Sequence, residues 1–310
     1  MQNLMGRDLL TLGDLTPEDL EAILIRAKSQ KLAHRNHTKA PVATGKSAAL
    51  IFMKPSLRTR ASFELACRDL GIHPMVMGPA DAFSRNETVH DTVKVLERYV
   101  QVIVLRTFAH AHVEEVAEHA SVPVINALTD DFHPCQVLAD LLTIKEHKGA
   151  LAGLRLAYIG DGNNMAHSLM LGGALAGMHV AVATPAGFEP QAAVVEKARA
   201  ISAEFGTGGG VTLHTAPTEA VASADVVVTD TWASMGQEAE HDARVRAFAG
   251  FTVDAELMAR ADSKALFMHC LPAHRGEEVT DEVIDGPQSV VFDEAENRLH
   301  AQRALLSLVL

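Results

Sequence analysis

The chain has 310 residues, of which 48% are apolar, and its 39 acidic and 27 basic side chains give a net charge of −12. This size and apolar content suffice for two α/β domains, each with a core of its own. The acidic balance argues against nucleic acid or an anionic membrane surface as the main partner, although it leaves room for a local cationic pocket.

No apolar run approaches the length that spans a membrane, and the first eight residues lack the apolar core of a signal peptide. The three cysteines, Cys67, Cys135 and Cys270, are odd in number and widely spaced. Without an export signal, this pattern predicts reduced thiols and a cytoplasmic location. His110 and His112 lie two positions apart with no third ligand in the pattern, so we interpret them as surface side chains and expect no metal site.

In the first half of the chain, apolar runs alternate with helical patterns. Thr16 and Pro17 predict a helix start, because Thr caps a helix and Pro suits its first position, and the polar segment 31–44 predicts a loop. The apolar runs predict strands at 48–52, 74–77, 102–105 and 122–125. Periodic segments predict helices at 60–71, 89–100 and 113–119.

The second half continues the alternation. Strands are predicted at 154–159, 180–183, 211–213, 224–229, 265–268 and 290–292, and helices at 165–176, 190–205 and 293–308. We therefore predict an α/β fold of two doubly wound domains, each a mostly parallel sheet flanked by helices, with a cleft between them. The predicted first domain is 1–132 joined by the C-terminal helix 293–310, the segment 133–148 is a linking helix, and 149–292 is the second domain.

The turn after the first predicted strand, residues 53–60, concentrates groups that bind anions. Ser56 and Thr59 supply hydroxyls, and Arg58 and Arg60 supply guanidiniums, at the N-terminus of the following helix. Helix N-termini carry unpaired backbone N–H groups, and Arg presents a rigid fork of donors to phosphate, so we expect a phosphate pocket here. The alternative is a solvated arginine pair capped by Ser.

Four further polar signatures also stand where an apolar strand ends. They are Arg106, residues 160–164, residues 230–236 and residues 269–272. Open α/β sheets bind ligands at the carboxyl edge of their strands, so we expect one cleft to collect all of these signatures. Arg106 alone is equally compatible with an ion pair.

A nicotinamide cofactor is an alternative, because Gly160 and Gly162 follow a strand. Met165 occupies the place of the third glycine, however, and Thr184-Pro185 stands where an acidic residue should close the next strand. Cys270 is either a small buried side chain or a thiol close to a substrate amine. Trp232 is either a packing anchor or a site residue.

Four motifs together identify the chain as similar to the aspartate/ornithine carbamoyltransferase family. They are Ser-Leu-Arg-Thr-Arg at 56–60, His-Pro-Cys-Gln at 133–136, Asp-Thr-Trp-Ala-Ser-Met-Gly at 230–236 and His-Cys-Leu-Pro at 269–272. The resemblance runs nearly end to end, and the last two motifs point to ornithine rather than aspartate as the acceptor. Its implied reaction is carbamoyl transfer from carbamoyl phosphate to ornithine, without a metal or cofactor, in a homotrimer or a multiple of trimers.

The resemblance also implies roles for individual residues. In the first domain, the phosphate would be held by Ser56, the Leu57 amide, Arg58 and Thr59, with Arg298 in the same pocket. Arg106 would bridge phosphate and carbonyl oxygen, His133 would polarise that oxygen, and Gln136 would contact the carbamoyl amide.

In the second domain, Asn164 and the Met235 amide beside Ser234 would take the α-carboxylate of ornithine, and Asp230 its α-ammonium. Cys270 would lie near the δ-amine and, with Leu271, complete the carbamoyl site, so the implied catalytic residues are Arg106, His133 and Cys270.

Two positions depart from the family pattern. Leu57 replaces the usual Thr, which preserves a backbone contact but removes a hydroxyl. Counting back from Glu87, Ala82 stands where the family often has a Gln that reaches a neighbouring subunit, and Ser84 replaces a Gly. We therefore expect either weaker binding of carbamoyl phosphate or a substitute contact from Ser84 or Arg85.

Other acceptors and other classes of protein remain alternatives. The alternative acceptors are acetylornithine, putrescine and aspartate. Acetylornithine and putrescine lack the free α-ammonium that Asp230 favours. A nicotinamide-dependent dehydrogenase and a non-catalytic metabolite sensor are the rival classes.

Overall fold

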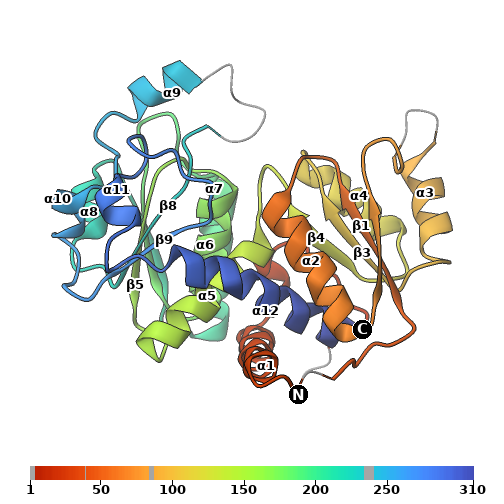
Figure 1. Ribbon diagram of the computed structural model, residues 1–310. Coiled ribbons are helices and arrows are strands. Elements are labelled where there is room, and N and C mark those ends of the chain that lie inside the picture. Colours follow the sequence, from red (N-terminus) through yellow and green to blue (C-terminus); the bar gives the residue numbers. More distant parts are fainter. Residues whose placement is uncertain (1–3, 39, 84–86, 234–240) are drawn as a thin grey trace. The chain divides into compact units, whose positions relative to one another are not determined.

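Figure 1 shows the computed structural model, which describes residues 4–38, 40–83, 87–233 and 241–310. The chain divides into two compact units, one formed by Met1–Leu142 with Glu296–Leu310 and the other by Thr143–Ala295. Helices α5 (Pro134–Lys148) and α12 (Val291–Val309) each begin in one unit and end in the other. Each unit contains a parallel sheet flanked by helices, which confirms the predicted α/β class of two domains, while the cleft expected between them stays a prediction.

The sheet of the first unit has four parallel strands in the order β2-β1-β3-β4. They are β1 (Ser47–Phe52), β2 (His73–Met77), β3 (Val102–Arg106) and β4 (Val124–Leu128). The other elements of this unit are η1 (Leu12–Asp14), α1 (Pro17–Arg35), α2 (Leu57–Leu70), α3 (Val89–Leu96) and α4 (His110–His119). Phe52 pairs with Arg106 at the carboxyl ends of β1 and β3. The turn after β1 and the side chain that ends β3 therefore lie at the same edge of the sheet.

Helix α1 starts as the sequence predicts but ends later. Thr16 and Asp19 form a capping box around Pro17 at the first helical position. The loop expected from residue 31 is wrong for its first part, because α1 continues to Arg35. Lys31 is only 4% exposed and its side chain donates a hydrogen bond to Asn297 of α12, so a tertiary contact extends the helix beyond its apolar pattern.

The sheet of the second unit has five parallel strands in the order β7-β6-β5-β8-β9. They are β5 (Arg155–Ile159), β6 (His179–Ala183), β7 (Gly210–His214), β8 (Val226–Thr229) and β9 (Leu266–His269). Thr229 pairs with His269, so the segments that follow β8 and β9 leave the sheet side by side (Figure 1). The strand expected at 290–292 is wrong: Ser289 forms only an isolated bridge to Phe267, and α12 begins at Val291 with acidic residues in its first turn.

The helices of this unit include four short ones that the sequence analysis missed. The set is α6 (Asn164–Leu175), α7 (Ala192–Phe205), α8 (Pro217–Val221), α9 (His241–Ala247), α10 (Ala255–Met258) and α11 (Asp281–Ile284). Trp232 is 4% exposed and stacks on Phe248, with ring centroids 5.4 Å apart, so it is a packing anchor of the core. No helix in the described part of the chain is both long and apolar enough to cross a membrane.

Candidate active site

The turn after β1 leads directly into helix α2 and leaves its N-terminus without a side-chain cap. Ser56 is the N-cap residue, but its side chain makes no capping hydrogen bond. Its Oγ is buried and has no hydrogen-bond partner among the described residues. A cavity of about 440 Å³ adjoins this turn and is lined by Lys54, Ser56 and Arg60, among others. A hydroxyl and the first N–H groups of a helix are therefore available to an anion here.

Behind this turn, two buried guanidiniums meet at one hydroxyl. Oγ1 of Thr59 accepts a hydrogen bond from Nη2 of Arg298 at 2.7 Å and another from Nη1 of Arg106 at 3.3 Å. Nη1 of Arg298 also donates to Oε1 of Gln136 at 2.7 Å, and Nε2 of Gln136 donates to Oδ1 of Asp140 at 2.8 Å. All five side chains are less than 10% exposed. Buried guanidiniums are weakly screened, which makes this edge of the sheet strongly attractive to a phosphate group.

His133 lies next to these arginines and is 4% exposed. Burial lowers the pKa of His133 well below its usual value, and the positive charges of Arg298, Arg106 and Arg58 lower it further. His133 is therefore neutral at pH 7. A neutral imidazole can donate one N–H hydrogen bond to a carbonyl oxygen without bringing a fourth positive charge into the cluster.

In the second unit, a carboxylate and a thiol lie at the ends of two neighbouring strands. Asp230 follows β8 and is 8% exposed, and Cys270 follows β9. Sγ of Cys270 donates to Oδ1 of Asp230 at 3.2 Å, and the amide of Thr231 donates to the same oxygen at 2.8 Å. The pairing of β8 with β9, which brings Asp230 beside Cys270, is invisible in sequence spacing.

Asn163, from the polar turn predicted at 160–164, and Tyr158, which the sequence analysis did not select, hold this pair in place. Nδ2 of Asn163 donates to Oδ2 of Asp230 at 3.1 Å, while its Oδ1 caps α6 and accepts from the Tyr158 hydroxyl at 3.2 Å. Burial, followed by the charge of Asp230, raises the pKa of Tyr158 well above its usual value, so its hydroxyl keeps the proton that it donates. The signal for Asn163 was its residue type directly before a helix, which is typical of an N-cap.

The side chain of His269 holds the turn that contains Cys270 and Leu271. Nδ1 of His269 accepts from the Leu271 amide at 2.9 Å, and Nε2 contacts Oε1 of Glu278 at 3.1 Å. Because Nδ1 accepts, Nε2 carries the proton and donates a hydrogen bond to Glu278. His269 and Glu278 are both fully buried, and Leu271 has a φ of 57° in the left-handed region. This arrangement fixes the peptide plane between Cys270 and Leu271.

The predicted site residues fall into two groups, one in each unit. The first unit brings together Arg58, Thr59, Arg106, His133, Gln136 and Arg298, and the second brings together Asp230 and Cys270. Asn164, 9% exposed, begins α6 directly after the Asn163 cap. The Leu57 side chain is 80% exposed, so only its backbone is available to the pocket. Ser234 and Met235 lie outside the described residues.

The sequence analysis interpreted His110 and His112 as surface side chains, and the structure shows that this is wrong. Both are half-buried, and their Nδ1 atoms lie 3.1 Å from Oγ1 of Thr129 and 3.0 Å from Oγ1 of Thr107. Burial lowers the pKa of both histidines. Helix α4 begins at His110, three residues earlier than predicted, and the two threonines that the rings contact directly follow β3 and β4.

Comparison with known protein families shows that the two units match the two domains of one family. Residues 7–146 match the family described as aspartate/ornithine carbamoyltransferase, carbamoyl-P binding domain. Residues 152–309 match its Asp/Orn binding domain. The chain belongs to the aspartate/ornithine carbamoyltransferase family. The resemblance inferred from four motifs is confirmed over the full chain.

The chain is similar to individual ornithine carbamoyltransferases along its whole length. The ornithine carbamoyltransferase of Carboxydothermus hydrogenoformans is 54% identical over 306 residues, which cover 98% of each chain. That of Symbiobacterium thermophilum is 52% identical and covers both chains completely. The solved ornithine carbamoyltransferase of Pyrococcus furiosus superposes with a TM-score of 0.96 at 51% identity, covering 100% of this chain and 98% of that one.

Gly162 of this carbamoyltransferase is explained by packing rather than by a dinucleotide. A Cβ atom at this position would lie 2.3 Å from the backbone nitrogen of Pro190, and the Gly162 amide donates to the carbonyl of Phe188 at 2.9 Å. The chain itself fills the space that a closely approaching pyrophosphate would need. This geometry counts against the dehydrogenase alternative.

Ala82, the position at which the family often has Gln, faces the core of its own unit. It is 2% exposed and packs in a cluster with Val93, Val113 and other apolar side chains. Ser84 and Arg85 lie outside the described residues, so the substitute contact expected from them stays a prediction.

Replacing Ala82 by Gln is therefore expected to destabilise the protein rather than restore a contact between subunits. Burying an amide in an apolar cluster costs about 1–3 kcal/mol, which denaturant unfolding would measure. Ala80→Gln is the matched control, because Ala80 is exposed in the same loop and should change stability by less than about 0.5 kcal/mol. Equal stability of the two variants would show that position 82 accommodates a side chain that points outward.

Proposed function

We propose that this protein transfers the carbamoyl group of carbamoyl phosphate to the δ-amine of L-ornithine, giving L-citrulline and phosphate. The observation that carries the proposal is the meeting of Arg106 and Arg298 at Thr59, beside a neutral His133. A dianionic phosphate and a developing oxyanion need this combination of positive charge and a neutral donor. The full-length similarity to proteins named ornithine carbamoyltransferase supports the same reaction.

The first unit would bind carbamoyl phosphate. The proposed phosphate contacts are the Ser56 hydroxyl, the Leu57 amide, Arg58, Thr59 and Arg298. Arg106 would bridge the phosphate and the carbonyl oxygen, because its guanidinium already reaches Thr59 within the pocket. His133 would donate to the carbonyl oxygen, and Gln136, oriented by Arg298 and Asp140, would accept from the carbamoyl amide.

The second unit would bind L-ornithine. Asp230 would pair with the α-ammonium, since a buried carboxylate favours a cationic partner. Asn164 and the Met235 amide beside Ser234 would take the α-carboxylate. Cys270 would lie near the δ-amine, and the carbonyl of Leu271, whose amide His269 holds, would help to hold the carbamoyl group.

In the proposed reaction, the uncharged δ-nitrogen forms a bond to the carbamoyl carbon, and the bond from that carbon to the phosphate oxygen breaks. Negative charge develops on the carbonyl oxygen and on the leaving phosphate, where Arg106, His133 and Arg58 stabilise it. The nitrogen gives up one proton. Because the Cys270 thiol donates to Asp230 and so carries its own proton, the departing phosphate is the proposed acceptor.

The choice of acceptor is tested by supplying carbamoyl phosphate with L-ornithine, acetylornithine, putrescine or L-aspartate and measuring the ureido product. Ornithine is expected to give the highest kcat/KM, because only an acceptor with a free α-ammonium and a terminal amine satisfies both Asp230 and the Cys270 region. A faster reaction with putrescine or acetylornithine would overturn this assignment.

The family membership also supports a homotrimer, or a multiple of trimers, as the assembly. Cys67, Cys135 and Cys270 form no disulfide, which fits the reduced cytoplasmic setting expected from the sequence.

Titration of His133 should not affect the pH dependence of the reaction between pH 6 and 8. Its lowered pKa keeps the ring neutral throughout this range, so protonation, which would add a fourth positive charge to the arginine cluster, occurs only in more acidic solution. Activity should instead rise with pH, because the δ-amine must lose a proton before it attacks. His133→Asn, which keeps a neutral N–H donor, should lower kcat without changing the shape of the profile. An acidic limb near pH 6.5 that disappears in this variant would contradict the assignment.

A further inference from the structure

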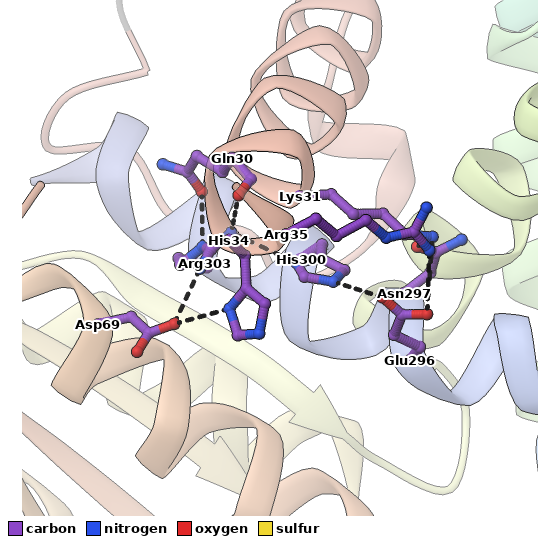
Figure 2. A network of polar contacts seen from close by, with 9 residues as sticks. All are labelled: Gln30, Lys31, His34, Arg35, Asp69, Glu296, Asn297, His300 and Arg303. Carbon is purple, nitrogen blue, oxygen red and sulfur yellow. Dashed lines mark hydrogen bonds and ion pairs between the residues drawn. The ribbon is translucent and has the colours of Figure 1, made fainter. Parts of the chain in front are cut away.

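A second polar cluster in the first unit has no part in the proposed chemistry. Figure 2 shows it between α1, α2 and α12, and we call it the α12 network. Its members are Gln30, Lys31, His34, Arg35, Asp69, Glu296, Asn297, His300 and Arg303. Helix α2 begins at the proposed phosphate turn, and α12 carries Arg298, so the network joins the two helices that supply the pocket.

Arg303 is the centre of the α12 network and is 3% exposed. Its Nη1 donates to Oδ2 of Asp69 at 2.8 Å, and its Nε donates to Oε1 of Gln30 at 3.2 Å. Its Nη2 donates to the Gln30 carbonyl and, at 3.3 Å, to Nδ1 of His300. One side chain of α12 thus ties together α1 and α2 (Figure 2).

Side-chain hydrogen bonds therefore join helices α2 and α12 at two positions along their axes. The first link is Arg298 to Thr59, in the proposed pocket, and the second is Arg303 to Asp69. Asp69 lies ten positions after Thr59, which is about 15 Å along α2, and Arg303 lies five positions after Arg298, which is about 7.5 Å along α12. A single link leaves two helices free to pivot about it, whereas a second link at a distance fixes their relative rotation.

A third contact acts directly beside Arg298. Nζ of Lys31 donates to Oδ1 of Asn297 at 2.7 Å, and both side chains are almost completely buried. Helix α1 therefore holds the residue that precedes Arg298, while Gln30 on the same helix holds Arg303. Both ends of this segment of α12 are restrained by neighbouring residues of α1.

We propose that Asp69 and Arg303 are positioning residues for carbamoyl phosphate: they hold α12 against α2 so that Arg298 stays in register with the phosphate turn. The inference rests on the proposed function for the identity of the ligand. Neither residue touches the ligand, and both act through Arg298. A small displacement of a charged group in a preorganised pocket weakens binding far more than it perturbs the fold.

The test compares Asp69→Asn with Asp19→Asn. Both changes remove a buried carboxylate from an Asp–Arg pair, since Asp69 pairs with Arg303 at 2.8 Å and Asp19 pairs with Arg7 at 2.9 Å. Asp19 caps α1 and contacts neither α2 nor α12 in its described hydrogen bonds. Asp69→Asn is expected to raise KM for carbamoyl phosphate about tenfold and to leave KM for ornithine within about twofold. Asp19→Asn should lower the thermal midpoint while leaving both KM values unchanged.

Binding of inorganic phosphate, measured by titration calorimetry, separates this inference from the proposed reaction. A wild-type protein that binds phosphate but forms no citrulline would refute the reaction, and the phosphate Kd of the two variants would still test the positioning role. Arg303→Lys, which keeps the charge but not the fork of donors, provides a second variant if Asp69→Asn does not fold, and it should also weaken phosphate binding. Equal KM and Kd values for the Asp69 and Asp19 variants, or unaltered phosphate binding in Arg303→Lys, would overturn the inference.

Discussion

Replacing Arg106 by Met is expected to lower kcat by about 10³-fold while the protein remains folded. Arg106 is the buried guanidinium at the end of β3, where it donates to Thr59 beside His133. A preorganised donor aimed at developing negative charge is worth about 10²–10³ in kcat, and Arg106 is proposed to serve both the carbonyl oxygen and the phosphate. Met has a similar length and is apolar, so it can fill the buried space. Steady-state kinetics with both substrates varied would separate kcat from the two KM values.

The matched control for this change is Arg155→Met. Arg155 also belongs to a strand, but it is exposed at the amino end of β5, opposite to the edge at which ligands bind. Its replacement should leave kcat within about twofold of the wild type. If Arg106→Met raised KM for carbamoyl phosphate but left kcat unchanged, Arg106 would contribute only to ground-state binding, and its catalytic role would be refuted.

Replacing Asp230 by Asn is expected to lower kcat/KM for ornithine by about 10²–10³-fold. Removing one partner of a buried ion pair costs about 3–5 kcal/mol, and each 1.4 kcal/mol corresponds to a factor of ten. Asn keeps the shape of Asp and can still accept from the Thr231 amide, but its NH2 group would then face the donor Nδ2 of Asn163, so the comparison with putrescine is needed to isolate the missing charge. The effect should be smaller for putrescine, which has no α-ammonium, and KM for carbamoyl phosphate should not change.

Asp225→Asn is the control at the opposite end of the same strand. Asp225 directly precedes β8 and accepts from the Arg155 amide, whereas Asp230 directly follows β8. The control variant should keep the wild-type kcat/KM for ornithine. A similar loss for putrescine and ornithine in Asp230→Asn would show that the carboxylate acts on the transferred amine or on the Cys270 turn instead of on the α-ammonium.

The alternation of apolar runs and helical patterns was sufficient to predict the two parallel sheets and the edges at which the site residues lie. Strand burial and helix caps are local signals: residues 48–52 of β1 and 102–105 of β3 are apolar and buried, and Thr16 with Asp19 caps α1 as its residue types indicate. Parallel strands place their carboxyl ends together, so Arg106 and the phosphate turn could be assigned to one edge from the sequence alone.

The contacts that sequence could not predict join residues far apart in the chain or lie in elements too short to show a period. Cys270 meets Asp230 through pairing of β8 with β9, and Arg303 meets Asp69 through packing of helices separated by more than 200 residues. Lys31 extends α1 through a buried contact with α12, which no local pattern reveals. Helices of four or five residues, such as α8 and α10, complete about one turn and therefore show no apolar repeat.

The most direct test of the proposed reaction follows the new bond itself. The protein would be given carbamoyl phosphate labelled with carbon-13 at its carbonyl and L-ornithine labelled with nitrogen-15 at the δ-position. Nuclear magnetic resonance of the product should show a one-bond coupling between the two labels, and it should show none when ornithine is labelled at the α-nitrogen instead. A coupling to the α-nitrogen, or no coupled product at all with the intact protein, would contradict carbamoyl transfer to the δ-amine.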